Sequence, residues 1–169
     1  MFFQSRKKLR LEGYDYNTAG AYFVTVCTAD RKPLLCTIPR VGADDHIGPN
    51  IQLTEIGNVV DKYTRTISGI DQYVIMPNHV HMIIFIPQEG TVWSPSPTRE
   101  EGTAWSPQGS IQTRIRTWKT LISKELGKSI WQRSFYDHVI RNERDYVEKT
   151  QYILNNPAKW CEDQYYPGF

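Results

Sequence analysis

The chain has 169 residues, 40% of them hydrophobic, and a formal net charge of only +2 at pH 7. This length suits one domain with a buried core, and the small charge gives no global signal for nucleic acid, although it leaves room for a local basic patch. Three cysteines without metal-ligand spacing favour reduced thiols over a disulfide framework, and no apolar run approaches the roughly 18 residues of a membrane-spanning helix, so we expect a cytoplasmic protein.

The first half of the chain predicts a strand followed by a helix. Residues 21–28 are rich in β-branched and aromatic side chains and are predicted to form a strand, whereas the turn-rich segment 39–49 is predicted to loop at the surface. Thr54 can cap a helix that ends at 68–69. Its apolar positions recur at helical spacing and predict one buried face, made of Ile56, Val59, Val60, Tyr63 and Ile67.

Two further strands, at 71–76 and 79–86, flank a Pro-Asn turn and predict an antiparallel hairpin. The second strand carries His79 and His81, and because strand side chains alternate between faces, the two imidazoles point the same way. A buried neutral imidazole needs partners for a donor and an acceptor nitrogen, and a divalent metal satisfies both acceptors at once. The alternative is a pair of hydrogen-bonded structural histidines, and two ligands alone do not decide between these readings.

The segment 87–109 is rich in Pro, Gly, Ser and Thr and contains a short duplication, so we predict a flexible insertion there. A helix at 110–126 follows. Its apolar stripe consists of Ile111, Ile115, Trp118 and Ile122. Arg114 and Lys119 lie largely off this stripe, so the basic side of the helix faces either phosphates or solvent.

Residues 130–140 read as an extended segment, Asn142 can cap a last helix, and Pro157 stops that helix. The order strand, helix, strand, strand, helix, strand, helix matches the split βαβ (ferredoxin-like) plan, an antiparallel sheet covered by helices on one face. The predicted fold class is therefore α+β, with residues 1–169 forming one domain.

The last helix carries two different stripes. The predicted buried stripe consists of Tyr146, Val147, Thr150, Ile153 and Leu154. Glu148, Tyr152 and Asn156 follow one another at steps of four on a second stripe. A tyrosine off the core stripe with an amide one turn later is either an ordinary half-exposed residue or a residue with a task beyond packing.

Three segments taken together resemble the REP-associated tyrosine transposases, relatives of the insertion-sequence single-tyrosine HUH transposases. They are 77–81 (Pro-Asn-His-Val-His), 131–138 and 145–157. The resemblance runs from about Tyr14 to Trp160. It implies the HUH endonuclease architecture, with the histidines on a central strand, the catalytic tyrosine on a following helix, and an activity in DNA transposition and recombination.

The resemblance implies that Tyr152 is the nucleophile, that His79 and His81 bind a metal, Mg²⁺ or Mn²⁺, and that Asn156 is the third ligand. Tyr152 would cleave single-stranded DNA to leave a 5′-phosphotyrosine and a free 3′-hydroxyl, and strands would be rejoined without ATP. Because all three ligands are neutral, we expect weak metal binding until a DNA phosphate arrives.

The implied partner is single-stranded DNA with hairpin-forming repeats. The residues predicted to contact its phosphates are Arg6, Lys7, Lys8 and Arg10 on a basic N-terminal arm and Arg114 and Lys119 on the helix. Trp93 and Trp105 either stack on bases or anchor the insertion. His138 is expected to be a structural histidine, hydrogen-bonded between the extended segment and the last helix.

Three alternatives accompany this reading. The His-Val-His run also resembles the start of the histidine-triad nucleotide hydrolases, but these need a third histidine where this chain has Ile83. A hairpin-binding protein that no longer moves DNA would need only the fold and a basic surface. Tyr136 and Tyr146 are rival nucleophiles by residue type, but neither has the polar neighbour that Tyr152 has.

Between a monomer and a tyrosine-swapping dimer, we expect a monomer.

Overall fold

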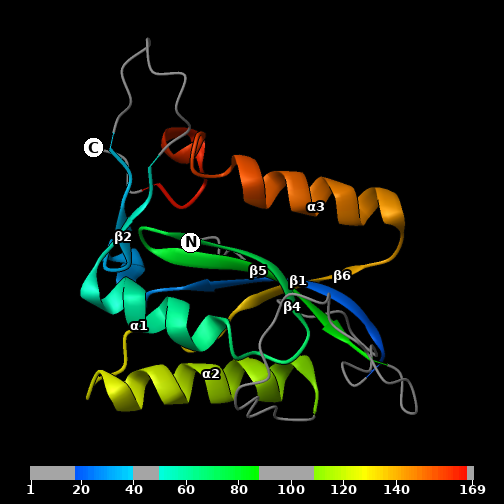
Figure 1. Cartoon of the computed structure of the whole chain (residues 1–169), viewed down its shortest axis with the longest axis horizontal. Helices are drawn as coiled ribbons and strands as arrows, with labels where there is room; N and C mark the ends of the chain where they lie inside the picture. The colour runs from blue at the N-terminus through cyan, green and yellow to red at the C-terminus, as the bar shows by residue number, and fades with distance from the viewer. Residues whose placement is uncertain (1–17, 40–49, 88–108, 167–169) are drawn as a thin grey trace, which may run out of the picture.

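An antiparallel sheet with helices on both faces forms the centre of the molecule (Figure 1). The computed structural model describes residues 18–39, 50–87 and 109–166. The strands of the sheet are β1 (Gly20–Cys27), β4 (Ile70–Met76), β5 (His79–Ile86) and β6 (Tyr136–Ile140), in the spatial order β4-β5-β1-β6. Every neighbouring pair is antiparallel, so the α+β class and the split βαβ plan are confirmed.

The two central strands, β1 and β5, fix the direction of the histidines. Cys27 pairs with His79, and Thr25 pairs with His81. Because paired residues of antiparallel strands share a face, Thr25 and both imidazoles point to the same side of the sheet. A tight turn between β4 and β5 brings Met76 opposite His79, as the predicted hairpin requires.

Helices α1 (Glu55–Thr64) and α2 (Ile111–Glu125) cover one face of the sheet (Figure 1). Thr54 and Ser110 cap them, each accepting a hydrogen bond from a backbone N–H of the first turn. A Cβ atom on Gly57 of α1 would lie 1.9 Å from the carbonyl oxygen of Leu35, so only glycine permits this close packing. The core beneath the two helices includes Tyr22, Val24, Val60, Ile115, Trp118 and Ile122.

Arg114 of α2 lies inside this layer and not on an exposed basic side. Its side chain is buried, Nε donates to the carbonyl of Gly109 at 3.1 Å, and Nη1 donates to the carbonyl of Ser68. The prediction that this charge faces phosphates or solvent is wrong, because the guanidinium is buried where it joins the chain after α1 to the chain before α2.

Helix α3 (Glu143–Asn155) covers the opposite face, so the prediction of helices on one face only is wrong for this last helix (Figure 1). Ile153 is its buried apolar residue, whereas Val147 is 44% and Leu154 65% exposed. The predicted buried stripe is therefore wrong at these two positions. The sheet beneath α3 carries polar histidines, so the helix is turned to present Asn156 beside Ile153 to that face.

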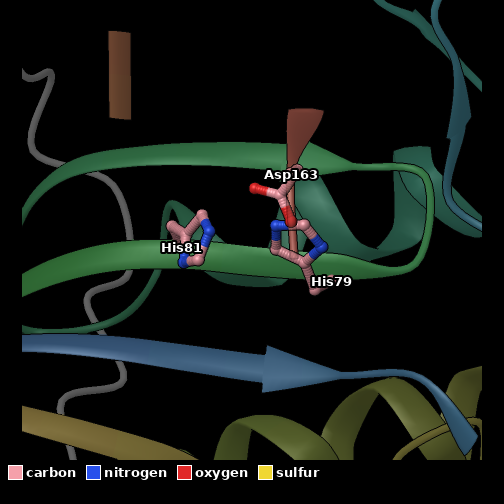
Figure 2. A group of neighbouring side chains, drawn as sticks. All are labelled: His79, His81 and Asp163. Carbon is pink, nitrogen blue, oxygen red and sulfur yellow. The ribbon is translucent and has the colours of Figure 1, made fainter. Parts of the chain in front are cut away.

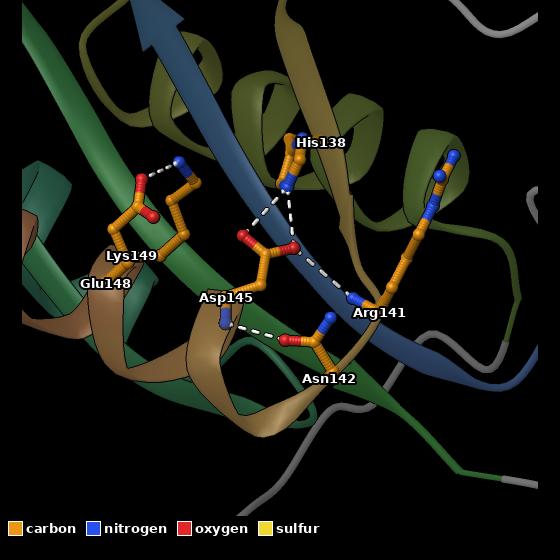
Figure 3. Close-up of polar contacts among 6 residues, drawn as sticks. All are labelled: His138, Arg141, Asn142, Asp145, Glu148 and Lys149. Atoms are coloured by element: carbon orange, nitrogen blue, oxygen red, sulfur yellow. Dashed lines mark hydrogen bonds and ion pairs between the residues drawn. The ribbon is translucent and has the colours of Figure 1, made fainter.

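The first turn of α3 is tied to β6 by a hydrogen-bonded group of side chains (Figure 3). Asn142 caps the helix by accepting from the N–H of Asp145 at 2.9 Å. The Asp145 carboxylate accepts in turn from His138 Nε2 at 2.9 Å and from the backbone N–H of Arg141 at 3.3 Å (Figure 3). The prediction that His138 is a structural histidine between strand and helix is confirmed.

Other elements differ from expectation in extent. Helix α1 ends at Thr64, before the predicted 68–69, and of the extended segment 130–140 only β6 and an isolated bridge between Thr28 and Trp131 belong to the sheet. A small sheet of β2 (Cys36–Thr37) and β3 (Gln52–Leu53) was not predicted. No helix in the described part of the chain is long and apolar enough to cross a membrane.

Several predictions concern residues outside the described ranges. They are the insertion, apart from its two end residues, the surface loop at 40–49, the N-terminal arm with Arg6, Lys7, Lys8 and Arg10, and the two tryptophans Trp93 and Trp105. These stay predictions.

Candidate functional site

His79 and His81 are buried on the face that α3 covers, with ring centroids 4.4 Å apart. Each ring is held at Nδ1: His79 Nδ1 donates to Asn78 Oδ1 at 2.9 Å, and His81 Nδ1 lies 2.8 Å from Thr25 Oγ1. The Nε2 atom of each ring is buried and has no hydrogen-bond partner within the described part of the chain. Two such nitrogen atoms on one face are donors of the kind that bind a divalent metal.

Burial keeps both histidines in the neutral form that binds metals. The pKa of His79 is lowered to about 3, first by burial and then by the positive charge of Arg31. The pKa of His81 is lowered well below its usual value, first by burial and then by the neighbouring His79. At neutral pH both rings are therefore uncharged, and no proton competes for the lone pairs.

Helix α3 places Tyr152 and Asn156 over the two histidines. The Tyr152 ring lies 5.1 Å from the ring of His81 and 6.0 Å from that of Phe23, centroid to centroid, and Tyr152 is 38% exposed. Asn156 is buried, and no described residue hydrogen-bonds to its Oδ1 atom. A cavity of about 520 Å³ borders both residues, so a substrate can reach the tyrosine.

Asp163 is a member of this site that sequence reasoning missed. One oxygen of its carboxylate and one nitrogen from each of His79 and His81 all lie within 4.8 Å of one another, and the three side chains face each other (Figure 2). Asp163 Oδ2 also accepts from Asn156 Nδ2 at 3.0 Å and from the Tyr152 hydroxyl at 3.3 Å. Nothing in the local pattern around residue 163 marks it, because it follows the last helix in a segment without periodicity.

The presence of Asp163 corrects one inference from the sequence. The predicted ligand set was neutral, and weak metal binding without DNA was expected for that reason. A carboxylate beside both histidines supplies the missing negative charge. The ligand set therefore no longer supports the expectation of weak metal binding in the absence of DNA.

Tyr152 is a phenol at rest. Its pKa is raised to about 12, first by burial and then by the negative charge of Asp163, which also accepts its hydrogen bond. A tyrosine in this state attacks poorly at neutral pH. Its activation has to come from a positive charge near the phosphate or from a group that removes the proton as attack proceeds.

The rival tyrosines lie elsewhere. Tyr136 is on the edge strand β6 and is 45% exposed, and Tyr146 donates its hydroxyl proton to Asp71 at 2.7 Å. Of the three candidates, Tyr152 alone has a ring contact with His81 among those found in the described residues.

Known proteins are similar to this chain in sequence. An uncharacterized protein of Haemophilus influenzae is 33% identical, over 95% of this chain and 93% of its own length. A REP-associated tyrosine transposase of Escherichia coli (strain K12) is 27% identical, over 85% of this chain and 70% of its own, and a putative one of Haemophilus influenzae is 24% identical, over 86% and 74%. The chain belongs to the REP-associated tyrosine transposases.

The fold of this transposase family agrees with the structure. A solved REP-associated tyrosine transposase bound to a REP hairpin matches with a TM-score of 0.55 and 24% identity, covering 89% of this chain and 74% of that one. At this identity the match concerns the fold. No protein-family model matches the chain.

A basic cavity of about 900 Å³ is lined by residues of α2 and of the chain that follows it. Helix α2 lies on the face of the sheet away from α3 (Figure 1). The lining of the cavity, as far as the described residues form it, has no carboxylate and includes five cationic side chains: Arg116, Lys119, Lys124, Lys128 and Arg133. Lys119 is partly buried in its wall and donates to the carbonyls of Gln132 and Ser134 at 2.8 and 3.0 Å. Of the two predicted phosphate contacts on α2, the structure thus brings Lys119 to a basic surface and removes Arg114 from it.

Proposed function

We propose that this chain is a DNA transposase that cleaves and rejoins single-stranded DNA through Tyr152. One observation carries the proposal: a partly exposed tyrosine lies against one of two buried, neutral histidines whose Nε2 atoms have no hydrogen-bond partner among the described residues. A structural histidine pair would use those atoms in hydrogen bonds, because an unpaired buried polar atom destabilises the fold. Membership of a transposase family supports the same activity class.

The donor set supports a divalent metal, Mg²⁺ or Mn²⁺, held by His79, His81 and Asn156, with Asp163 as the anionic donor. Three buried atoms without partners, His79 Nε2, His81 Nε2 and Asn156 Oδ1, are available to it. Mixed nitrogen and oxygen donors favour Mn²⁺ over Mg²⁺, although Mg²⁺ is the usual cellular competitor. When bound, the ion would polarise the scissile phosphate and orient it for attack.

The reaction of Tyr152 is a substitution at phosphorus. The bond from Tyr152 Oη to phosphorus forms while the bond from phosphorus to the 3′ oxygen breaks, and that oxygen leaves with the electron pair and takes up a proton. The phenolic proton passes to Asp163 Oδ2, which lies at hydrogen-bond distance from Oη. The result is a 5′-phosphotyrosine and a free 3′-hydroxyl. Attack of a 3′-hydroxyl on the phosphotyrosine reverses these steps and joins strands.

Hairpin-forming DNA is the proposed partner. A solved relative is bound to a REP hairpin, and the basic cavity beside α2 offers five cations to a phosphate backbone. Lys119 keeps its predicted role as one of these contacts. The N-terminal residues Arg6, Lys7, Lys8 and Arg10 are proposed to follow phosphates in the same way.

A covalent adduct tests the proposal. Single-stranded hairpin DNA, labelled on the strand 3′ of the cleavage point, is incubated with Mn²⁺ and each of three chains: the native chain, Tyr152→Phe and Tyr136→Phe. We expect a denaturation-resistant protein–DNA adduct from the native and Tyr136→Phe chains and none from Tyr152→Phe, which should still bind the hairpin. Tyr136 is the matched control because it is a similarly exposed tyrosine away from the histidines.

Two outcomes would refute the assignment. A persistent adduct with Tyr152→Phe would remove Tyr152 as nucleophile. Hairpin binding by the native chain without adduct or cleavage over a range of Mn²⁺ concentrations would favour the alternative, a hairpin-binding protein that does not move DNA.

A further inference from the structure

The loop that follows β1 has an unusual backbone. Asp30 and Arg31 both adopt positive φ, at 55° and 54°. This left-handed region is uncommon for residues other than glycine, and two such residues in succession are disfavoured unless the surroundings hold them there. The loop is therefore fixed in a particular direction by its contacts.

Those contacts connect the loop to a metal-site histidine. Arg31 N–H donates to Thr28 O at 3.1 Å, and Thr28 N–H donates to Asn78 O at 2.9 Å. The side chain of Asn78 makes three hydrogen bonds: Nδ2 donates to Arg31 O at 3.2 Å and to Tyr165 O at 2.7 Å, and Oδ1 accepts from His79 Nδ1 at 2.9 Å. One buried amide thus positions both His79 and the backbone of Arg31.

The Arg31 side chain lies at the border of the site. Its guanidinium carbon is 5.1 Å from the centroid of the Tyr165 ring, and that ring is 4.7 Å from the His79 ring. The charge of Arg31 is also one of the two causes that lower the pKa of His79. The cation therefore acts on the site although its side chain is exposed.

A transferring phosphate needs positive charge that a carboxylate does not already neutralise. Asp163 adds negative charge to the site, and Lys149, which lies 6.0 Å from the Phe23 ring, pairs with Glu148 at 3.2 Å (Figure 3). Among the described residues, none of the ion pairs involves Arg31. Its planar guanidinium matches two phosphate oxygens at once.

We propose that Arg31 is a catalytic residue that leaves the Tyr165 ring to bind the non-bridging oxygens of the scissile phosphate, stabilising their negative charge while Tyr152 displaces the 3′ oxygen. This rests on the proposed cleavage by Tyr152 and adds to it a cation from the β1 loop. The strained, hydrogen-bonded backbone orients the Arg31 side chain. Asn78, which hydrogen-bonds to both Arg31 and His79, fixes the position of one relative to the other.

The test compares Arg31→Gly, Arg31→Lys and Lys32→Ala with the native chain. Glycine is the clean truncation because it adopts positive φ without strain. Lys32 is the matched control, since it is the next residue, carries the same charge and has a side chain that is 65% exposed. Single-turnover cleavage is measured at saturating single-stranded DNA with Mn²⁺, and DNA affinity is measured separately by fluorescence anisotropy.

We expect Arg31→Gly to cleave about 100-fold more slowly than the native chain. Arg31→Lys should be slowed about tenfold because a point charge replaces the two-pronged contact. DNA affinity should change less than about threefold in both, and Lys32→Ala should match the native chain within about threefold, as expected for an exposed charge. Matching circular dichroism spectra and melting temperatures exclude a folding defect, and Arg31→Lys carries the test if the glycine variant is unstable.

A substrate with a methylphosphonate at the cleavage position adds a sharper measurement, because it lacks the charge that Arg31 is proposed to meet. The penalty of Arg31→Gly should shrink to within about threefold on it. An undiminished penalty on that substrate, or a rate for Arg31→Gly equal to that of Lys32→Ala, would overturn the role of Arg31 while leaving Tyr152 as nucleophile. An absence of adduct from the native chain would instead refute the proposed function and this inference with it.

Discussion

Two hydrogen bonds decide which nitrogen each site histidine offers. Asn78 Oδ1 can only accept, so His79 carries its proton on Nδ1 and leaves the Nε2 lone pair free. Thr25 Oγ1, opposite His81 on β1, can hold that ring in the same way. The sheet register thus sets the direction of the rings, and the neighbouring side chains set their protonation.

Metal binding can be predicted from this arrangement. His79→Ala should weaken Mn²⁺ binding at least tenfold in calorimetric titration of the DNA-free protein, because one of two buried nitrogen donors is lost. His138→Ala is the control, since this histidine binds Asp145 and lies outside the site. Equal Mn²⁺ affinity in the two variants would mean that the ion, if bound, uses other residues.

At the residue scale, the strand and helix periods predicted part of the site. Alternation along β5 placed His79 and His81 on one face, and the spacing of four set Tyr152 and Asn156 apart from the core stripe, although their roles came from the family resemblance. Asp163 could not be predicted, because its place over His79 depends on how the chain folds back after α3 (Figure 2). Such a return is determined by tertiary contacts and not by a local pattern.

At the scale of single elements, helix α2 shows the limit of reasoning from a helical stripe. Its apolar stripe is buried as predicted, at Ile111, Ile115 and Trp118. Arg114 is buried as well, because its long side chain reaches two backbone carbonyls beyond the end of the helix. A helical stripe defined by hydrophobicity places arginine on the surface. It therefore does not predict that a buried arginine donates to backbone carbonyls.

The titration of Lys119 on α2 should make DNA affinity depend on pH. Burial lowers the pKa of Lys119 to about 8, so its charge in the basic cavity is lost as the pH rises through that value. Affinity for hairpin DNA at constant salt should therefore fall between pH 7 and 9 by about three- to tenfold. Lys119→Arg, which stays charged, should fall less than about twofold.

The effect of Lys119 on folding stability changes with pH in the direction opposite to its effect on DNA affinity. Because its pKa is lower in the folded chain than in the unfolded chain, the unfolded chain binds more protons from about pH 8 to about pH 10.4, and folding stability rises with pH across that window. A parallel fall of stability and DNA affinity would contradict the assignment of the pH effect to Lys119.

At the scale of the whole molecule, one sheet separates two apolar clusters. One lies under α1 and α2, and the other, with Ile153 and Trp160, lies under α3 around the site (Figure 1). Both clusters use side chains of β1, whose residues alternate between them. Neither layer therefore has a core that is independent of the sheet.

We expect the chain to unfold as one domain and as a monomer. Scanning calorimetry should show a single transition whose calorimetric and van't Hoff enthalpies agree. Both should be about 100 kcal/mol. Mn²⁺ should shift it upward without splitting it, and the midpoint should not depend on protein concentration. Two transitions would contradict the single domain, and a concentration-dependent midpoint would contradict the monomer.

The order of the site residues along the chain has a consequence for protein synthesis. The histidines belong to a strand in the middle of the sequence, whereas Tyr152 belongs to the last helix. A product of interrupted translation that ends between that strand and the last helix contains both histidines and lacks the proposed nucleophile. Under the proposed function, such incomplete chains cannot form the covalent link to DNA that Tyr152 would make.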